Sequence, residues 1–271
     1  MSVLYTPKGR AREYSSLAVN HYSGCSHGCS YCYVPTIPPF KFNSAPRHSF
    51  HSDPRPRRNL ISQLESDCRR NPGDGQRVML SFTTDPYQPI DVEHRLTRAV
   101  IQVLHAYGYH VQVLTKGGRR ALYDLDLFTT GDAFATTMTY LSSVHSRKWE
   151  PRAALPADRI LAIRAFHAAG IPTWVSLEPV LNPDSAIKII RLLHPIVDLF
   201  KIGKLNHHPL ADRFDWQSFG MQASALCEEV GVAYYIKHDL AAHFPANYQT
   251  GPHQVTVEQI ERAPIRQPTL F

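Results

Sequence analysis

Three of the five cysteines stand close together in the chain, and their spacing is the clearest chemical feature of the sequence. Cys25, Cys29 and Cys32 fall within eight residues in the pattern C-x3-C-x2-C, whereas Cys68 and Cys227 are isolated. An odd number of cysteines, in a chain whose first residues show no export signal, argues against a disulfide framework. Three thiols at this density therefore indicate a metal site.

Two kinds of metal site fit this group of thiols. A structural zinc ion needs a fourth ligand to close its tetrahedron, and His27 lies between the first two cysteines. A [4Fe–4S] cube usually takes four thiolates, so three thiolates would leave one iron open for an exogenous ligand. Gly24 and Gly28 permit the backbone turns that bring three sulfurs around one centre. Packed core thiols are a poorer interpretation, because Ser, Gly and His surround the cysteines.

The elements that must position this loop alternate between β-branched apolar stretches and amphipathic helical patterns. The predicted strands are Leu17–Tyr22, Val78–Phe82, His110–Thr115, Ala133–Thr137, Thr173–Leu177, Leu199–Ile202 and Ala233–Ile236. The predicted helices are Glu93–Tyr107, Ala157–Ala169, Asp184–His194 and Asp215–Val230. Strand–helix alternation of this kind predicts a parallel sheet with right-handed crossovers.

The predicted fold class is α/β, as a partial (β/α)6-type TIM barrel with the cysteine loop after its first strand. About six or seven strand–helix units favour a partial barrel over a full eight-fold one, and a doubly wound open sheet is the alternative. No GxGxxG or Walker-type glycine loop follows a strand, which weakens a nucleotide-fold interpretation. The active site of a β/α barrel lies at the carboxyl ends of its strands, so the thiols are expected there.

We expect three parts along the chain. Residues 1–16 form an N-terminal extension, residues 17–240 form the barrel, and residues 241–271 form a tail that wraps it. Segment 35–58 is rich in Pro, Arg and His, and is expected to be an extended loop within the barrel.

The composition is that of an ordinary globular protein, with 43% hydrophobic and 19% charged residues among 271. This composition excludes disordered, collagen-like and disulfide-dense classes. No run reaches the ~18–20 apolar residues that a membrane span needs. A soluble, cytoplasmic protein without a membrane partner is therefore expected.

The cysteine loop resembles the radical S-adenosylmethionine (radical SAM) superfamily. The spacing, the aromatic Tyr31 before the last cysteine and the β/α context carry this resemblance, which extends from about Asn20 to Lys237. Further motifs resemble the branch of spore-photoproduct-lyase-like or DNA-repair-photolyase-like proteins. These motifs are GCSHGCSYCY, the run TTDPYQPID at 83–91, LTK at 114–116 and the segment RAFHAAGIP.

The resemblance implies a specific cofactor chemistry. Cys25, Cys29 and Cys32 would hold a [4Fe–4S] cluster, and S-adenosylmethionine would chelate the open iron. An electron, from a donor of the flavodoxin or ferredoxin type, would cleave S-adenosylmethionine reductively to a 5′-deoxyadenosyl radical. That radical would abstract a hydrogen atom from the substrate. The lack of a second cysteine group implies a single cluster.

The resemblance also assigns roles to residues at the strand ends. The expected contacts to the cofactors are Tyr31, Tyr33, Thr84, Asp85, Lys116, Thr137, Glu178 and Ile202. The expected substrate or catalytic residues are Tyr87, Gln88, Lys204 and Asn206. Two of these residues have structural alternatives, because Asp85 could cap a helix and Lys116 could be a surface lysine.

An extra thiol serves as hydrogen donor in spore photoproduct lyase, but nothing is carried over to the remaining cysteines. Cys68 stands in a helical stretch and not at a strand end, and Cys227 lies in the last predicted helix. If neither thiol reaches the radical, dimer splitting by that same route is in doubt.

Basic residues concentrate in one stretch of the sequence. Residues 41–70 contribute +4 of the net charge of +6. Such a stretch could follow a phosphate backbone, or it could be a solvated loop and helix face. The candidate nucleic-acid contacts are Arg47, Arg55, Arg57 and Arg58.

The last five residues, QPTLF, resemble the QxxLF peptide by which bacterial DNA enzymes bind the sliding clamp. Gln267, Leu270 and Phe271 would make that contact, unless the terminal Leu and Phe pack on the domain. The first hypothesis is therefore a radical SAM enzyme of DNA repair or base modification. The alternatives are the same chemistry on a peptide, protein or small molecule, and a non-catalytic zinc-binding module.

Overall fold

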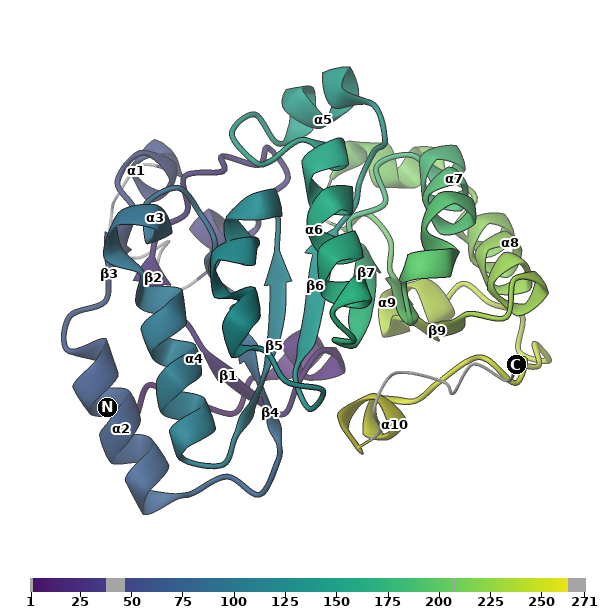
Figure 1. Cartoon of the computed structure of the whole chain (residues 1–271). Coiled ribbons are helices and arrows are strands. Elements are labelled where there is room, and N and C mark those ends of the chain that lie inside the picture. The colour runs from purple at the N-terminus through teal and green to yellow at the C-terminus, as the bar shows by residue number, and fades with distance from the viewer. Residues whose placement is uncertain (1, 38–46, 207, 263–271) are drawn as a thin grey trace.

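A seven-stranded parallel sheet organises the molecule. The computed structural model describes residues 2–37, 47–206 and 208–262 (Figure 1). The strands of the sheet are β1 (Leu17–Val19), β4 (Arg77–Leu80), β5 (His110–Thr115), β6 (Ala133–Thr137), β7 (Thr173–Leu177), β8 (Leu199–Ile202) and β9 (Ala233–Ile236). All seven predicted strands are confirmed, although the first and second end earlier than expected.

The order of these strands in the sheet is β1-β4-β5-β6-β7-β8-β9, and every neighbouring pair is parallel. Each strand is therefore added beside the preceding one in the same direction. A doubly wound sheet would reverse its strand order at a switch point, so the partial β/α barrel is confirmed. The seven strands agree with the six or seven strand–helix units that the sequence predicts.

Helices connect the strands and cover the outer face of the sheet. The α-helices are α1 (Arg47–Ser52), α2 (Leu60–Arg70), α3 (Asp91–His94), α4 (Leu96–Ala106), α5 (Ser143–Trp149), α6 (Pro156–Ala168), α7 (Pro183–Leu193), α8 (Trp216–Glu229), α9 (His238–Ala241) and α10 (Val257–Arg262). Short 3-10 helices are η1 (Gly9–Glu13), η2 (Val34–Thr36), η3 (Gly118–Leu127), η4 (His194–Ile196) and η5 (Pro209–Arg213). Figure 1 shows α2, α4, α6, α7 and α8 succeeding one another across the molecule in chain order.

Alternate strand residues divide the core into an outer and an inner part. Residues such as Val78, Val113 and Phe134 pack against the helices in one large apolar cluster. Their strand neighbours, among them Met79 and Trp174, form a second and smaller cluster on the inner face. The inner face is also lined by polar side chains toward the carboxyl ends of the strands, which is where chemistry is expected.

The terminal segments cover both edges of the open sheet. Tyr5 forms an antiparallel bridge with Ala18 of β1, and Gln254 forms a parallel bridge with Tyr234 of β9. Unpaired edges are prone to non-native pairing, so these short bridges protect the barrel where it does not close. Ile260 of the C-terminal segment is buried in the inner cluster.

Two local expectations differ from the structure. Segment 35–58 is not wholly extended, since it contains the short helix α1 and the strand β3 (Arg55–Pro56), which pairs with β2 (Tyr22–Ser23). The helix predicted over 93–107 is broken at Arg95, whose φ of 50° is left-handed. Within the described residues, the model contains no helix with the length and apolar character of a membrane span.

Candidate functional site

The cysteine loop leaves β2 at the carboxyl end of the sheet and is fixed to the segment that follows it. The N–H of Cys25 donates to the carbonyl of Phe50 at 3.0 Å. Nδ1 of His51 lies 2.9 Å from the carbonyl oxygen of Cys25. The loop also makes a tight turn of its own, because the N–H of Cys32 donates to the carbonyl of Cys29 at 3.1 Å.

Two glycines are required by the path of this loop. Gly24 has φ +82°, and a Cβ there would lie 2.7 Å from the carbonyl oxygen of Phe50. Gly28 has φ +67°, and a Cβ there would meet the guanidinium of Arg152 at 2.9 Å. Both positions lie in the left-handed region that glycine adopts without strain, so the sequence expectation about these turns is confirmed.

Gln88 connects the loop after β4 to the cysteine loop. Its Oε1 accepts from the N–H of Ser26 at 2.9 Å, and its Nε2 donates to the carbonyl of Gly24 at 3.2 Å and to Oγ1 of Thr84 at 2.8 Å. Thr84 itself donates to the carbonyl of Gly24 at 2.6 Å. Gln88 is fully buried. These bonds hold the loop, and the expected contact of Gln88 with substrate stays a prediction.

Asp85 is surrounded by donors from the protein. Its oxygens accept from the N–H of Lys116 at 2.7 Å and from Oγ1 of Thr115 at 2.5 Å, and the N–H of Tyr87 donates at 3.0 Å. Burial alone would raise the pKa of Asp85, but His27 and these hydrogen bonds hold it well below its ordinary range. The carboxylate ties the end of β4 to the end of β5, and its contact to a cofactor stays a prediction.

His27 is held away from the thiols. Nδ1 of His27 lies 3.4 Å from Oδ2 of Asp85, and the guanidinium of Arg120 lies 3.2 Å from Nε2. Both ring nitrogens are therefore engaged within the protein. A zinc ion held by His27 would have to displace one of these two contacts.

The three thiols have the environment of a cluster site. Burial raises the pKa of the Cys29 thiol to about 12, against the charge of Lys116, and raises that of Cys25 further. Thiolates are stabilised when positive metal ions replace the lost water. Among the described residues, the three sulfurs do not all lie within 4.8 Å of one another.

A buried ion pair underlies the loop on its inner side. Tyr31 donates to Oε1 of Glu150, and Arg159 donates to Oε2 of Glu150 at 2.6 Å. Burial would raise the pKa of Glu150, but Arg159 and Lys116 lower it. Nζ of Lys116 also lies 5.7 Å from the centre of the Tyr31 ring. The sequence analysis selected Tyr31 and Lys116 but missed Glu150 and Arg159, because these two residues belong to no recognisable sequence motif.

A second cluster of polar side chains lies in the lumen, the space enclosed by the inner face of the sheet, beside β7, β8 and β9. Oε2 of Glu178 accepts from the phenol of Tyr14 at 2.8 Å and pairs with Nζ of Lys237. Nζ of Lys201 lies 4.5 Å from the ring of Trp174 and 4.9 Å from that of Tyr14. Lys237 directly follows β9, so the strand-end rule that selected Glu178 could also have found it. Tyr14 stands outside the predicted strands and gave no signal.

These geometries can be compared with known proteins. The model of the radical SAM superfamily matches residues 19–193, which run from the end of β1 to the end of α7. The chain belongs to the radical SAM superfamily. This superfamily uses a [4Fe–4S] cluster and S-adenosylmethionine, which confirms the predicted cofactors. It also removes the ground for the zinc-module hypothesis.

Curated relatives of this superfamily member have no assigned function. Uncharacterized proteins of Mycobacterium tuberculosis and Mycobacterium bovis are each 32% identical over 188 residues, which is 66% of this chain and 54% of theirs. An uncharacterized protein of Methanocaldococcus jannaschii is 21% identical over 234 residues, 85% of this chain and 77% of its own. The chain spans about half the length of the mycobacterial relatives.

Solved structures of spore photoproduct lyase share the fold. One, complexed with dinucleoside spore photoproduct, has a TM-score of 0.65 and 14% identity, over 86% of this chain and 79% of that chain. A double mutant with bound AdoMet and the same dinucleoside has a TM-score of 0.64 and 15% identity, over 87% and 78%. The predicted radical SAM partial barrel is thereby confirmed.

Three further residues that the radical SAM resemblance selected do not face an open site. Ile202 lies in the outer core against the helices, and the expected adenine contact at this position stays a prediction. Tyr87 is buried in the same core, and its expected role with substrate stays a prediction. Thr137 lies on the inner face but is buried, and its carbonyl accepts from Nη1 of Arg159 at 2.9 Å.

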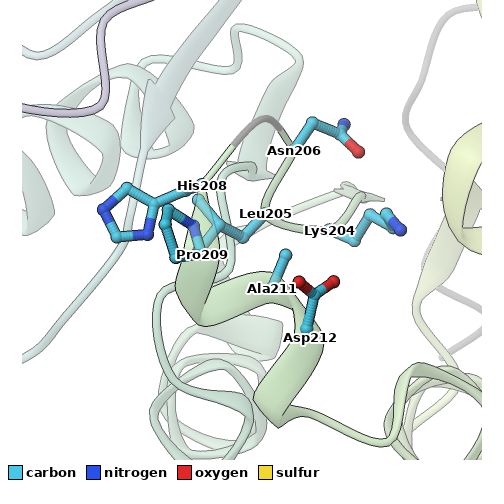
Figure 2. Close-up of a pocket in the computed structure, with 7 residues that line it drawn as sticks. All are labelled: Lys204, Leu205, Asn206, His208, Pro209, Ala211 and Asp212. Atoms are coloured by element: carbon cyan, nitrogen blue, oxygen red, sulfur yellow. The ribbon is translucent and has the colours of Figure 1, made fainter.

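Two predicted substrate residues do line a pocket. A cavity of about 350 Å³ follows β8. Its lining residues are Lys204, Leu205, Asn206, His208, Pro209, Ala211 and Asp212 (Figure 2). Nζ of Lys204 lies 3.0 Å from Nε2 of His243, and Nδ2 of Asn206 donates to Asp239 at 3.3 Å. Figure 2 shows Lys204 and Asn206 on the loop and Asp212 on the helix η5 below it.

The basic candidates have different surroundings. Arg55 and Arg58 are exposed, and Arg55 forms an ion pair with Asp53. Arg57 donates from Nη1 to the carbonyl of Asn20 at 3.1 Å, which is a structural contact. The side chain of Arg47, and the tail residues Gln267, Leu270 and Phe271, lie outside the described residues. Tyr33 is half exposed, and its phenol donates to the carbonyl of Phe82 at 3.4 Å.

Proposed function

We propose that the protein is a radical SAM enzyme that abstracts a hydrogen atom from a nucleic acid or nucleobase, in DNA repair or base modification. The observation that carries this proposal is the pairing of β3 with β2, in which Arg55 stands opposite Ser23. Ser23 precedes the first cluster cysteine by two residues. The basic segment therefore flanks the cofactor loop, and a strand bound along it would pass close to the reactive centre.

The chain provides the parts that this chemistry needs. Cys25, Cys29 and Cys32 would hold the cluster. When bound, the cluster supplies the electron that cleaves S-adenosylmethionine to methionine and a 5′-deoxyadenosyl radical. Partly buried Tyr31 and fully buried Glu150 and Arg159 form a layer beneath the loop that limits the access of water, and exclusion of water protects a reactive intermediate from side reactions.

The surroundings of the site favour an anionic substrate. Arg55 and Arg58 are exposed on the segment beside the loop, and Arg152 is exposed where its Nε donates to the carbonyl of Ser26 at 2.5 Å. Phosphate contacts of this kind fix the register of a nucleic acid without reading its sequence. Lys204 and Asn206 line a pocket beyond the same ends of the strands, where they could hydrogen-bond a base.

A comparison structure supports the same substrate class. Spore photoproduct lyase shares the fold and was solved with dinucleoside spore photoproduct bound. A thiol that donates hydrogen to a substrate radical would have to lie in the lumen. Cys68 and Cys227 are instead buried in the outer core between sheet and helices. We therefore propose nucleic-acid chemistry that does not use either thiol as the hydrogen donor.

Two partners belong to this proposal. An electron donor of the flavodoxin or ferredoxin type would reduce the cluster. A sliding clamp would bind the C-terminal Gln267, Leu270 and Phe271, and a synthetic peptide of the last five residues would compete with the full chain for the clamp. Deleting these five residues should abolish clamp binding and leave cleavage of S-adenosylmethionine unchanged.

The salt dependence of DNA binding tests the substrate class. Binding of a labelled oligonucleotide to the cluster-loaded protein is measured by fluorescence anisotropy over a range of salt concentrations. If Arg55 and Arg58 each neutralise one phosphate, the double variant Arg55→Gln/Arg58→Gln should lower the slope of log K against log salt by about 2. The matched control is Lys188→Gln/Arg191→Gln, two exposed residues on α7, which should leave the slope unchanged.

Failure of this test would separate the substrate from the chemistry. Absence of DNA binding at low salt, with cleavage of S-adenosylmethionine intact, would replace the nucleic acid by a peptide, protein or small molecule. A slope that falls equally in the control variant would show that only the overall charge attracts DNA, and that segment 55–58 is not a specific contact.

A further inference from the structure

Three side chains that are common metal ligands converge at the end of the barrel opposite the cysteine loop. His105 lies in the last turn of α4, His110 begins β5, and Asp132 immediately precedes β6. Their ligand atoms all lie within 4.8 Å of one another, and no other such group of His, Cys, Asp or Glu occurs among the described residues. These positions mark the amino-terminal ends of β5 and β6, whereas the cysteine loop lies at the carboxyl ends.

The distances within this group fit the ligands of one ion. Oδ1 of Asp132 lies 2.9 Å from Nε2 of His105 and 3.6 Å from Nδ1 of His110. Two ligand atoms that are each about 2.0–2.2 Å from a tetrahedral ion stand about 3.3–3.6 Å apart. The two imidazole rings meet at 72° and not in a stack, so both can direct a nitrogen at the same point. Only small side-chain shifts separate this arrangement from a coordinated one.

The carboxylate is oriented by contacts of its own. Asp132 is fully buried. Its Oδ1 accepts from the N–H of Val111 at 2.7 Å, and its Oδ2 accepts from the N–H and Oγ1 of Thr129 at 2.6 and 2.8 Å. Burial would raise the pKa of Asp132, but these hydrogen bonds and His105 lower it. Fixed orientation of a ligand by hydrogen bonds around it is a property of metal sites.

His110 supplies the observation that points to a missing partner. Its Nδ1 is shielded from solvent and has no hydrogen-bond partner among the described residues. The ring packs closely against Gly131, where a Cβ would lie 2.1 Å from Cε1 of His110. A buried polar atom without a partner is costly, and a metal ion placed between this nitrogen and Asp132 would relieve that cost.

We propose that His105, His110 and Asp132 bind one divalent transition-metal ion of the zinc type. Two imidazole nitrogens and one carboxylate oxygen are the donor set that such ions prefer. The side chains of His105 and His110 remain 23% and 37% exposed, so a water molecule can reach the fourth position. The ion links α4, β5 and β6, and it stabilises the folded state because it binds the unfolded chain weakly.

The test uses the cluster-loaded protein, prepared anaerobically and freed of loosely bound metal. One equivalent of zinc is added, its affinity is measured by titration calorimetry, and its ligands are identified by X-ray absorption at the zinc edge. We expect one zinc per chain with a first shell of nitrogen and oxygen, and an unchanged iron content. A sulfur shell would instead show that zinc occupies the cysteine loop.

A histidine variant and a matched control decide the assignment. His110→Ala should weaken zinc binding ~100-fold or more, since loss even of an outer contact to a ligand costs up to that amount. His94→Ala, at an exposed position at the end of α3, should bind zinc as the wild type does. Retention of the cluster in His110→Ala shows that the variant folds. No zinc bound by the wild type, or equal affinity in His110→Ala, would overturn the proposal.

Discussion

Polar side chains have different roles around the cysteine loop and in the lumen of the later strands. Around the loop, Gln88, Asp85 and Thr84 direct their hydrogen bonds to the backbone of the protein itself. In the lumen, Lys201 and Lys237 are buried, and the amino groups of both lie over the ring of Tyr14. The first region holds the cysteine loop in one shape, whereas the second places buried charges among aromatic rings.

The two lumen lysines illustrate how burial and partners compete. Burial lowers the pKa of Lys201 to about 7. Burial would lower the pKa of Lys237 as well, but Tyr14 and the ion pairs with Glu178 and Glu13 raise it above its ordinary range. The difference teaches that Lys237 is part of a satisfied structural pair, and that Lys201 can change its charge near neutral pH. The predictions below test this contrast, beginning with the largest effect.

Replacement of one cluster thiol should have the largest effect. Cys29→Ala removes one of the three thiolates, so the protein should retain almost no iron and should lose cleavage of S-adenosylmethionine. Iron and sulfide analysis after anaerobic reconstitution measures this loss. The control Cys68→Ala alters a buried thiol of α2 in the outer core and should keep the cluster. Equal iron in both variants would contradict the assignment of the loop.

Glu150→Gln should destabilise the loop region by about 3–5 kcal/mol, because it leaves the buried charge of Arg159 without its partner. Urea denaturation followed by circular dichroism measures the loss, and Glu229→Gln, an exposed residue of α8, is the control. The pKa of Glu150 is lowered in the folded state. Its stabilisation is therefore present above the unfolded pKa and disappears as the pH falls through the folded pKa, where variant and wild type should converge.

Gln88→Leu should cost about 1–3 kcal/mol, since it leaves the N–H of Ser26 without its buried partner and removes one of the two donors to the carbonyl of Gly24. The same change should shorten the lifetime of the cluster in air, which is followed by the decay of its visible absorbance. Gln222→Leu, on the exposed side of α8, should alter neither quantity. An unchanged cluster lifetime in Gln88→Leu would show that the loop keeps its shape without this contact.

Lys201→Met should produce the smallest effect at neutral pH and a characteristic dependence on pH. Between pH 7 and 10 the unfolded lysine is protonated and the folded lysine is increasingly neutral, so the wild type gains up to ~1.4 kcal/mol per pH unit. The stability of the wild type relative to Lys201→Met should therefore rise over this range, as thermal denaturation at each pH would show. Lys237→Met should lack this gain, because the pKa of Lys237 is raised.

Much of the fold could be predicted because the relevant signals are local. β5 to β9 coincide with apolar stretches that end at strand boundaries, and helix-ending glycines such as Gly170 separate them. The break at Arg95 was not predictable from periodicity, since the apolar pattern continues through it. Segment 35–58 was expected to be an extended loop, but Arg47–Ser52 within it forms α1.

The candidate site also has a part that the sequence predicts and a part that only the packing of the barrel reveals. The three cysteines and Tyr31 are close in sequence, so their spacing alone indicated a cluster. The partners of the site meet across long separations: Tyr31 contacts Glu150 and Glu178 contacts Lys237. Only packing of the barrel brings such pairs together. The buried hydrogen bonds of Gln88 to the cysteine loop were likewise not predictable, because a polar residue in a loop after a strand can face either the lumen or a neighbouring loop.

The central claim is that the cysteine loop holds a cluster with one iron open to S-adenosylmethionine. Electron paramagnetic resonance of the anaerobically reconstituted and reduced protein, with and without S-adenosylmethionine, tests it most directly. We predict a [4Fe–4S]⁺ signal that changes when S-adenosylmethionine is added. The absence of a cluster signal, or a signal that S-adenosylmethionine leaves unchanged, would contradict the account.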